Sequence, residues 1–352
     1  MPGEFGIPRP RLFWTLLIGL SMKEMQNKWL ALVNVFAASH KAGSIWKKAA
    51  VKLENAGIDY KARFTGGKYN AMELSRIAAS EGYRRFIAVG GDGTIHDVLN
   101  GIAEYVFSSD TEKVRLSDFT LAVIPVGSGN DWVKSAGVPR DITSAIDVIA
   151  SGRTGVQDVV RVSIYESSDD AVQGGNVIAE SYMANVGGVG LDARVCEIVN
   201  RKKEQGYRGK QLYVSALLYC IRHRVPVRAR VLCDGNQIFS GKYLSMAFGV
   251  GRYSGGGMRQ TSLAVMDDGL LDVTVIPDIP LLAIAREVPK LFTGSFHKVG
   301  VLTQSRCRSV VILPDSASDA EPVEVDGEVV GRAPVKMEVL EDQLNIVILR
   351  VS

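Results

Sequence analysis

The chain has few cysteines, little net charge and no apolar run long enough to cross a membrane, and each shortage excludes a class of protein. Its four cysteines, among 352 residues, show no C-x-x-C spacing, and a single Cys-His pair, Cys220 and His223, is too few ligands for a zinc site. A disulfide scaffold and a cysteine-based zinc site are therefore excluded, and the thiols indicate a reducing compartment. A net charge of +3 is too small to indicate nucleic acid as the main partner.

An apolar segment near the N-terminus, Leu12–Leu20, is too short to span a bilayer. No small-x-small cleavage site follows it, so it is not typical of a signal peptide. Residues 1–28 are expected to form an extension. It is either a segment upstream of a product that begins at Met22 or Met25, which we prefer, or a peripheral membrane anchor.

The hydrophobic pattern divides the rest of the chain in two. With 46% hydrophobic and 22% charged residues the chain is globular, and its length favours two domains. Over residues 29–152 apolar strands alternate with helical patterns, which is typical of a parallel sheet covered by helices. Over residues 153–335 short strands dominate, and only Leu212–His223 and Leu281–Phe292 have helical spacing. We therefore expect an α/β domain followed by a β-sandwich.

A glycine-rich turn, Gly90–Thr94, follows the apolar strand Phe86–Val89 and precedes a helix expected over Ile95–Tyr105. Glycines can adopt positive φ and carry no Cβ, so backbone N–H groups can close on an anion. The positive end of the helix dipole points to the same place. The turn therefore favours phosphate binding, although an ordinary strand-to-helix loop is the alternative.

A second such turn, Pro125–Asp131, follows the next strand, Leu121–Ile124. Because carboxyl ends of neighbouring parallel strands meet at one edge of a sheet, the two turns are expected to form one site. They supply backbone donors, the hydroxyls of Thr94 and Ser128, and a carboxylate at Asp92 or Asp131 that orients donors or holds a metal. A nucleotide needs this set, whereas the alternative is that Asn130 and Asp131 only cap the next helix.

Five segments in a fixed order carry a family resemblance. They are Gly90–Thr94, Asn100–Gly101, Pro125–Asp131, Asp267–Asp272 and Asp326–Glu328. This set resembles the diacylglycerol kinase catalytic family, in particular the soluble bacterial lipid kinases that are also similar to sphingosine and ceramide kinases. The resemblance extends from about Trp29 to the C-terminus.

The resemblance implies an ATP-dependent kinase with its active site in the cleft between the domains. Residues 29–152 would form a Rossmann-like ATP-binding domain, completed by a strand from the C-terminal segment 336–352, and residues 153–335 the β-sandwich that binds the lipid. The nucleotide-side residues are expected to be Asn34, Thr65, Gly90, Gly91, Asp92, Gly93, Thr94, Ile95, His96, Asp97, Gly127, Ser128, Gly129, Asn130 and Asp131.

The acceptor side requires a base, because a lipid hydroxyl loses its proton as it meets the γ-phosphorus. By resemblance Glu328 is the proton acceptor, and Asp326 supports it or the metal. From the residues alone, a β-turn with solvated acids is the preferred interpretation of this triplet, and the family resemblance reverses that preference.

A Mg²⁺ site is implied at a further turn, through the side chain of Asp268 and the carbonyls of Val265 and Leu270. Hard oxygen donors of this kind suit a divalent cation, and such an ion would brace the second domain. A plain Asp-Gly hairpin is the alternative.

The chain departs from the family pattern in two places. The loop Asn34–Gly43 lacks the usual Asn-Pro and glycine-containing sequence, so its phosphate-side shape is in doubt. Asp97 stands where glutamate is usual, one methylene shorter. His96 is expected to be a surface helix residue rather than a catalyst.

Basic and aromatic residues alternate over residues 201–230. They predict either a solvated face or a surface that docks transiently on anionic lipid headgroups at the inner face of the membrane, which suits a cytoplasmic protein. A homodimer is also considered. The function expected is phosphorylation of a lipid hydroxyl, with diacylglycerol first and sphingoid bases, ceramide or phosphatidylglycerol next. The alternatives are an NAD kinase and a nucleotide-binding regulatory protein without catalysis.

Overall fold

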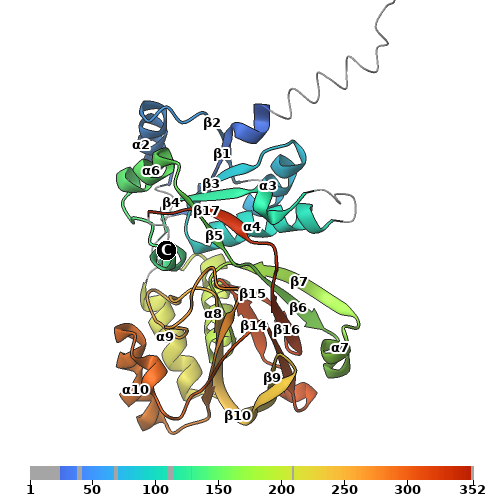
Figure 1. The fold of residues 1–352 in the computed structure, drawn as a ribbon. Coiled ribbons are helices and arrows are strands. Elements are labelled where there is room, and N and C mark those ends of the chain that lie inside the picture. The colour runs from blue at the N-terminus through green and yellow to red at the C-terminus, as the bar shows by residue number, and fades with distance from the viewer. Residues whose placement is uncertain are drawn as a thin grey trace, which may run out of the picture.

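The computed structural model describes residues 24–37, 42–66, 70–108, 114–127, 129–207 and 210–349, which form two domains stacked on each other (Figure 1). The apolar segment Leu12–Leu20 and Ser128 lie outside the described residues.

The first domain contains a six-stranded sheet in the order β2-β1-β3-β4-β17-β5. Its strands are β1 (Trp29–Val33), β2 (Tyr60–Phe64), β3 (Arg85–Gly90), β4 (Thr120–Pro125), β5 (Thr154–Gln157) and β17 (Leu344–Val347). All neighbours pair in parallel except β5, which runs antiparallel to β17. The central strands β1, β3 and β4 are short apolar runs, as expected for parallel strands covered on both faces.

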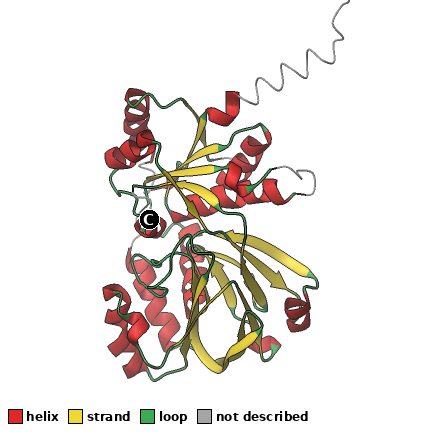
Figure 2. Cartoon of the chain, in the orientation of Figure 1, coloured by secondary structure: helices red, strands yellow, loops and turns green. Residues whose placement is uncertain are grey.

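Helices cover both faces of this sheet (Figure 2). They are α2 (Ala42–Asn55), α3 (Ala71–Ser80), α4 (Asp92–Phe107), α5 (Asp131–Ser135) and α6 (Ile142–Ser151), with the short 3₁₀ helix η2 (Leu116–Asp118) before β4. Because side chains alternate along a strand, β3 contributes Phe86 to the core under α3 and α4 and Ile87 to the core under α2 and α6. The first of these cores packs α4 on the sheet, with the α4 N-terminus at the carboxyl edge.

The second domain is built from antiparallel strands in the order β15-β14-β8-β10-β9-β13-β16-β6-β7. In addition, β11 pairs with β10, and β12 pairs with β11. The strands are β6 (Val160–Tyr165), β7 (Val177–Met183), β8 (Val186–Gly190), β9 (Val227–Cys233), β10 (Asn236–Gly249), β11 (Leu271–Pro277), β12 (Thr303–Cys307), β13 (Ser309–Pro314), β14 (Pro322–Val325), β15 (Glu328–Arg332) and β16 (Val335–Val339). Their inward side chains form one apolar core. The predicted fold class, an α/β domain with a β-sandwich, is confirmed.

The helices of this domain are α7 (Ser168–Gln173), α8 (Leu191–Glu204), α9 (Lys210–Arg222) and α10 (Leu281–Thr293), with 3₁₀ helices η3 (Phe296–Lys298) and η4 (Ala317–Asp319). The expectation of only two helices here was wrong, because α7 and α8 are also present. The signal for α8 was its apolar spacing: Leu191, Val195 and Val199 recur every four residues and are buried against α9.

The chain crosses between the domains twice. The first crossing lies between β5 and β6, so β5, which follows residue 152, belongs to the first sheet. The second lies between β16 and β17. Asp158 joins the two crossings, since its carboxylate accepts a hydrogen bond from Gln343 Nε2 at 2.8 Å. Within the described ranges no helix is long and apolar enough to cross a membrane.

Candidate active site

The first glycine-rich turn leads directly into α4, which begins at Asp92 rather than at the predicted Ile95. None of its glycines has positive φ, contrary to the expected reason for their presence. They allow close approach instead: a Cβ on Gly90 would overlap the Thr94 hydroxyl, and one on Gly91 would lie 3.1 Å from the Cα of Gly127. The partial positive charge of the α4 N-terminus therefore lies at this turn.

The second turn packs against the first. The backbone N–H of Val126 donates to the carbonyl of Gly90 at 2.8 Å, and a Cβ on Gly127 would lie 2.6 Å from the Cα of Gly91. A carboxylate joins the turn to α5, because Asp92 Oδ1 accepts from the N–H of Trp132 at 2.9 Å. Burial raises the pKa of Asp92. The two turns thus form one continuous surface, as predicted.

The alternative role of Asn130 and Asp131, capping the next helix through their side chains, is not observed. Asn130 adopts φ 52°, its side chain makes no cap hydrogen bond, and its Nδ2 donates to the carbonyl of Gly127 at 2.8 Å. Asp131 instead binds Lys134 Nζ at 2.6 Å and, from the second domain, the N–H of Gly256 at 2.6 Å. Gly129 lies beside the same carboxylates, since a Cβ there would be 3.2 Å from Asp92 Oδ2.

Two strand-end residues complete the nucleotide side. Asn34, at the end of β1, donates from Nδ2 to the Thr94 hydroxyl at 2.9 Å. Thr65 follows β2 and is buried, and its Oγ1 has no hydrogen-bond partner among the described residues. The buried Oδ1 of Asn130 also has no hydrogen-bond partner among the described residues. Buried polar atoms without partners are costly, so their presence beside both turns fits a polar ligand.

The acidic turn between β14 and β15 faces these turns from the second domain. Asp326 has φ 53°, and its carboxylate accepts the N–H groups of Ala184 and Asn185, each at 2.9 Å. Its Oδ2 also lies 3.5 Å from Nδ1 of His96, on α4. Asp326 is therefore fixed by its own domain and touches the other.

The expectation that His96 is a surface residue was wrong, because it is 7% exposed and lies between the domains. Burial alone would lower its pKa, but the hydrogen bond and charge of Asp326, with the charges of Asp97 and Glu328, give a net rise. His96 is thus held toward its protonated form by acids from both domains. Burial also raises the pKa of Asp97 to about 6.

Glu328, the first residue of β15, lies against the first turn of α4. A Cβ on Gly93 would stand 3.3 Å from Glu328 Oε1, while Oε2 accepts from Asn200 Nδ2, on α8, at 3.2 Å. The structure therefore brings Asp326 and Glu328 to the N-terminus of α4, beside the two glycine-rich turns. Ile95, in the first turn of α4, is buried in the core of the first domain, so its side chain is not part of the turn surface.

Sequence reasoning did not assign their role to several residues that join the domains. Asn100 binds both the N–H and the carbonyl of Tyr182, at 2.8 and 2.9 Å. Asn185 binds Ser135 Oγ and the carbonyl of Tyr253, at 2.9 and 2.7 Å. The loop that contains Gly255–Gly257 reaches Asp131, and its three consecutive glycines were a signal that could have found it.

A pair of buried acids lies behind the acidic turn. Desolvation raises the pKa of Asp192 and, well above its usual range, that of Glu324, and each carboxylate raises the other's cost of ionisation. Glu324 Oε2 accepts from the N–H of Gly327 at 2.8 Å, and Asp192 Oδ2 accepts from Ser245 Oγ at 3.0 Å. The bond from Gly327 to Glu324 ties the Asp326–Glu328 turn to β14.

The turn predicted to hold Mg²⁺ lies elsewhere. Asp268 binds the guanidinium of Arg306 through Oδ2 and the N–H of Leu270 through Oδ1, while Asp158 accepts from Gly269 N at 2.7 Å. The described residues contain no group of three or more His, Cys, Asp or Glu side chains able to hold a metal. Val265, Asp268 and Leu270 do supply oxygen donors, but a cation there must displace Arg306. Their metal role stays a prediction.

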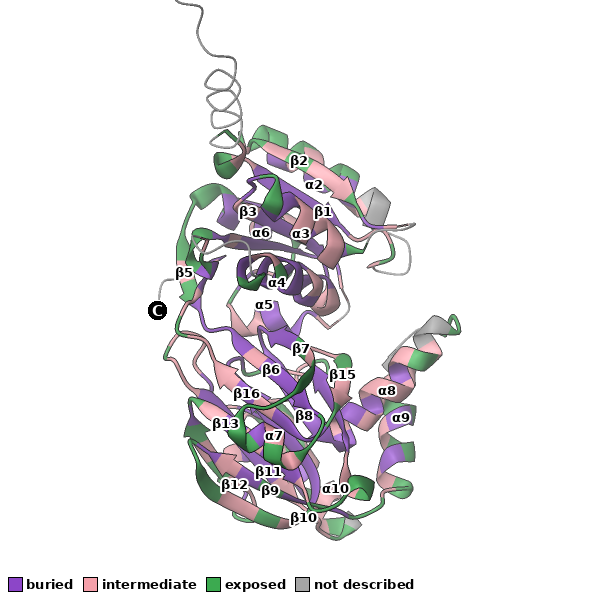
Figure 3. Cartoon of the chain, turned by 90° about the vertical axis from the view of Figure 1, so that its right-hand side faces the viewer, coloured by how far each residue is buried: buried purple, intermediate pink, exposed green. Residues whose placement is uncertain are grey.

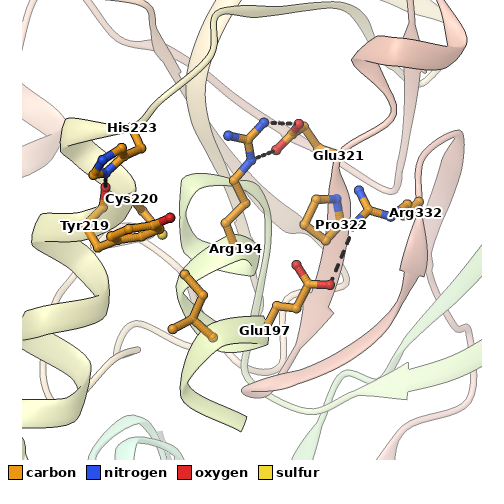
Figure 4. Close-up of a pocket in the computed structure, with 9 residues that line it drawn as sticks. Arg194, Glu197, Tyr219, Cys220, His223, Glu321, Pro322 and Arg332 are labelled. Atoms are coloured by element: carbon orange, nitrogen blue, oxygen red, sulfur yellow. Dashed lines mark hydrogen bonds and ion pairs between the residues drawn. The ribbon is translucent and has the colours of Figure 1, made fainter. Parts of the chain in front are cut away.

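A pocket of about 270 Å³ lies outside the cleft, between α8, α9 and the start of β14 (Figure 4). Arg194 pairs with Glu321 in it, and Arg332 lies 3.7 Å from Glu197. The lining is mixed, because the two ion pairs lie beside Ile198, Tyr219, Cys220 and Pro322.

Two packed glycine-rich turns on one domain, faced by an acidic turn on the other, are the arrangement of a two-domain phosphotransferase. Comparison with known proteins agrees. Residues 28–162 match the diacylglycerol kinase catalytic domain, and residues 185–348 match the YegS C-terminal NAD kinase beta sandwich-like domain. The chain belongs to the diacylglycerol kinase catalytic family and is a lipid kinase of that family. The family implies that it uses ATP and a lipid substrate.

Named relatives cover most of the chain. A diacylglycerol kinase of Mycobacterium tuberculosis is 25% identical over 285 residues, which are 81% of this chain and 84% of that protein. One from Staphylococcus carnosus is 26% identical over 296 residues, 84% of this chain and 87% of that protein. A crystal structure of a diacylglycerol kinase from Bacillus anthracis str. Sterne has the same fold, with a TM-score of 0.65 and 21% identity over 92% of this chain and 97% of that one.

Proposed function

We propose that the protein transfers the γ-phosphoryl group of ATP to a lipid hydroxyl, with diacylglycerol as the first candidate and sphingoid bases, ceramide or phosphatidylglycerol next. One observation carries this proposal: Glu328 of the second domain lies against Gly93, in the first turn of the helix that follows the phosphate-binding turn. A base and a phosphate site in contact are what an in-line transfer to an alcohol requires.

On the donor side, the turns that contain Gly91 and Gly127 would bind the ATP phosphates. The α4 N-terminus supplies backbone donors and partial positive charge, which stabilise the negative charge that develops on the transferred group. Thr65 and Asn130 each have a buried oxygen free to accept from the nucleotide. These features favour nucleotide binding over the alternative, an ordinary strand-to-helix loop.

On the acceptor side, Glu328 would take the proton of the lipid hydroxyl as its oxygen attacks the γ-phosphorus. The bond between that phosphorus and the bridging oxygen breaks, and ADP leaves with the electron pair. Asp326 cannot easily take this proton, because both its oxygens already accept backbone N–H groups. We therefore assign Asp326 to positioning the turn and His96, and Glu328 to the base.

Magnesium has two possible places in this scheme. An ion bound with the ATP phosphates would neutralise charge during transfer, and Asp92 or Asp131, the carboxylates within the two turns, would hold it. A second ion at Val265, Asp268 and Leu270 would brace the interdomain crossing, because Asp158 links that turn to Gln343. This second ion has a structural role and does not touch the reactants.

The proposal is tested by incubating the protein with radiolabelled ATP, Mg²⁺ and a total lipid extract. We expect one labelled lipid, absent with Glu328→Ala and with Asp92→Ala, while Glu341→Ala, an exposed acid outside the cleft, leaves it unchanged. Labelled NADP from added NAD would identify an NAD kinase instead. ATP binding without transfer to any lipid would indicate a regulatory protein.

A further inference from the structure

The motif Asn100–Gly101 lies in the middle of α4, and the proposed function leaves it without a role. Its glycine packs α4 on the first domain, since a Cβ on Gly101 would stand 2.1 Å from the carbonyl oxygen of Met72, on α3. Its asparagine binds the second domain instead, through the backbone of Tyr182 on β7. The motif therefore joins α4 to both domains.

The side chain of Asn100 uses its full hydrogen-bonding capacity. Its Nδ2 donates to the carbonyls of His96, one helical turn earlier, and of Tyr182, each at 2.9 Å. Its Oδ1 accepts from the N–H of Tyr182 at 2.8 Å and from Ser181 Oγ at 3.1 Å. An amide has two N–H donors and two acceptor lone pairs, so all four are paired. Asn100 is only 4% exposed, so breaking these bonds would leave buried polar groups without partners.

One face of α4 meets the second domain along the length of the helix (Figure 1 and Figure 3). Gly93, Asn100 and Phe107 recur every seven residues, which is close to two helical turns, so they lie on this face. Phe107 stacks on the ring of Tyr182, with the ring centroids 5.3 Å apart. Asn100 therefore lies between this stack and the contact of Gly93 with Glu328.

A short stretch of backbone leads from Tyr182 to the acidic turn. Two and three residues further along the chain, the N–H groups of Ala184 and Asn185 donate to the carboxylate of Asp326, each at 2.9 Å. Glu328 lies two residues beyond Asp326. A shift of this stretch away from α4 would therefore carry Glu328 with it.

We propose that Asn100 is a positioning residue for phosphoryl transfer. By binding Ser181 and Tyr182, it sets how closely Glu328 approaches the phosphate-binding turns. Asn100 acts through Asp326 and Glu328 and not on the reactants themselves. This inference rests on the proposed function for the reaction that it serves. A small shift is enough, because a displacement of about 1 Å at a reacting group can lower the rate by roughly a hundredfold.

The first test compares Asn100→Ala with Asn345→Ala. Asn345 is the matched control, because its amide also donates to two carbonyls, those of Ser117 and Phe119, at 2.6 and 3.0 Å, but within the first domain. Asn100→Ala should lower kcat by roughly tenfold or more without changing the affinity for ATP, since the residues proposed to bind ATP lie in the first domain. Asn345→Ala should keep the wild-type kcat. Equal kcat in the two variants overturns the proposal.

A milder variant decides if Asn100→Ala does not fold. Ser181→Ala removes a single hydrogen bond to Asn100 and leaves α4 unchanged. It should lower kcat by roughly threefold, the effect of one ordinary hydrogen bond. In that case a wild-type kcat in Ser181→Ala overturns the proposal.

Two further measurements separate positioning from a general loss of stability. Amide hydrogen exchange over residues 182–185 should become faster in Asn100→Ala, while β6 exchanges as in wild type. In a Glu328→Gln background, Asn100→Ala should lower kcat by less than about threefold, because the group that it positions no longer accepts a proton. The same loss in both backgrounds, or unchanged exchange, overturns the proposal.

The exchange measurement needs no substrate, so it distinguishes this inference from the proposed function. If wild type phosphorylates no lipid, the proposed function fails. Faster exchange over residues 182–185 in Asn100→Ala then still supports the hold of Asn100 on the second domain, and unchanged exchange overturns it.

Discussion

The carboxylate of Glu328 and the backbone of Gly93 come from different domains and are in contact: a methyl group on Gly93 would stand 3.3 Å from Glu328 Oε1. A methyl group at this position would force the carboxylate to move by a few tenths of an ångström. His96 and Asp97 lie on the same helix, and the charge of Glu328 contributes to raising the pKa of both. The junction of the domains is thus also the place where the proposed phosphate site meets the proposed base.

Replacing Gly93 with alanine tests this contact. The added methyl group is tolerated by the helix, where alanine is favoured by about 0.5 kcal/mol, but it pushes the flexible Glu328 side chain aside. We expect unchanged or slightly higher thermal stability and a kcat lowered by about tenfold to a hundredfold. Gly300→Ala, with nothing within 4 Å of the new Cβ, is the control. Equal kcat in Gly93→Ala and wild type would contradict the contact.

The His96–Asp326 pair should make stability depend on pH. The pKa of His96 is raised above its ordinary 6.5, so the folded state holds the proton more tightly than the unfolded chain. The resulting stability is fully present below pH 6.5 and is lost as the pH rises through the folded pKa. His96→Gln should therefore cost more at about pH 5.5 than at about pH 8.5 in denaturant titrations.

A double-mutant cycle with Asp326→Asn assigns the effect to the pair. We expect a coupling free energy of about 1 kcal/mol or more at the lower pH, decreasing as the imidazole loses its charge. A loss for His96→Gln that is the same at both pH values would show that packing alone holds the ring.

Removing the charge of Asp97 should stabilise the protein, in contrast to the loss expected for His96→Gln. The folded pKa of Asp97, about 6, is above the ordinary 3.8 because burial disfavours the charged carboxylate. Between these two values the folded state holds a proton that the unfolded chain has lost, so stability falls as pH rises. Asp97→Asn should raise the Tm above pH 6 and leave it unchanged below about pH 3.8. A gain that persists at low pH would mean that the charge is not its origin.

Magnesium at the Asp268 turn is tested by thermal melting with the ion or with EDTA. Binding to the folded state alone raises the Tm, so Mg²⁺ should stabilise wild type and not Asp268→Ala. Arg306→Gln should bind the ion more tightly, because it frees the carboxylate oxygen that Arg306 occupies. If Mg²⁺ changes the Tm of neither wild type nor Arg306→Gln, the ion does not bind at this turn.

The nucleotide side was predictable because its information is local. Gly90–Thr94 and Pro125–Asp131 each follow an apolar strand, and adjacent parallel strands place their carboxyl ends together. The start of α4 was misplaced because Asp92, Gly93 and Thr94 read as turn residues, whereas tertiary packing holds them in the helix.

The acceptor side was less predictable because its partners are far apart along the chain. The surroundings of His96 include Asp326, which lies 230 positions later in the sequence and belongs to the other domain. The roles of Asn185 and of the loop with Gly256 likewise arise from contacts between domains. The family resemblance supplied Glu328, and no periodicity could have done so.

The central claim, that Glu328 is the base facing the phosphate site, is tested most directly by the rate of phosphoryl transfer in Glu328→Gln. Glutamine keeps the size and the bond to Asn200 but accepts no proton, so kcat should fall by about a hundredfold or more while ATP binds with unchanged affinity. Retention of the wild-type kcat by this variant would contradict the account.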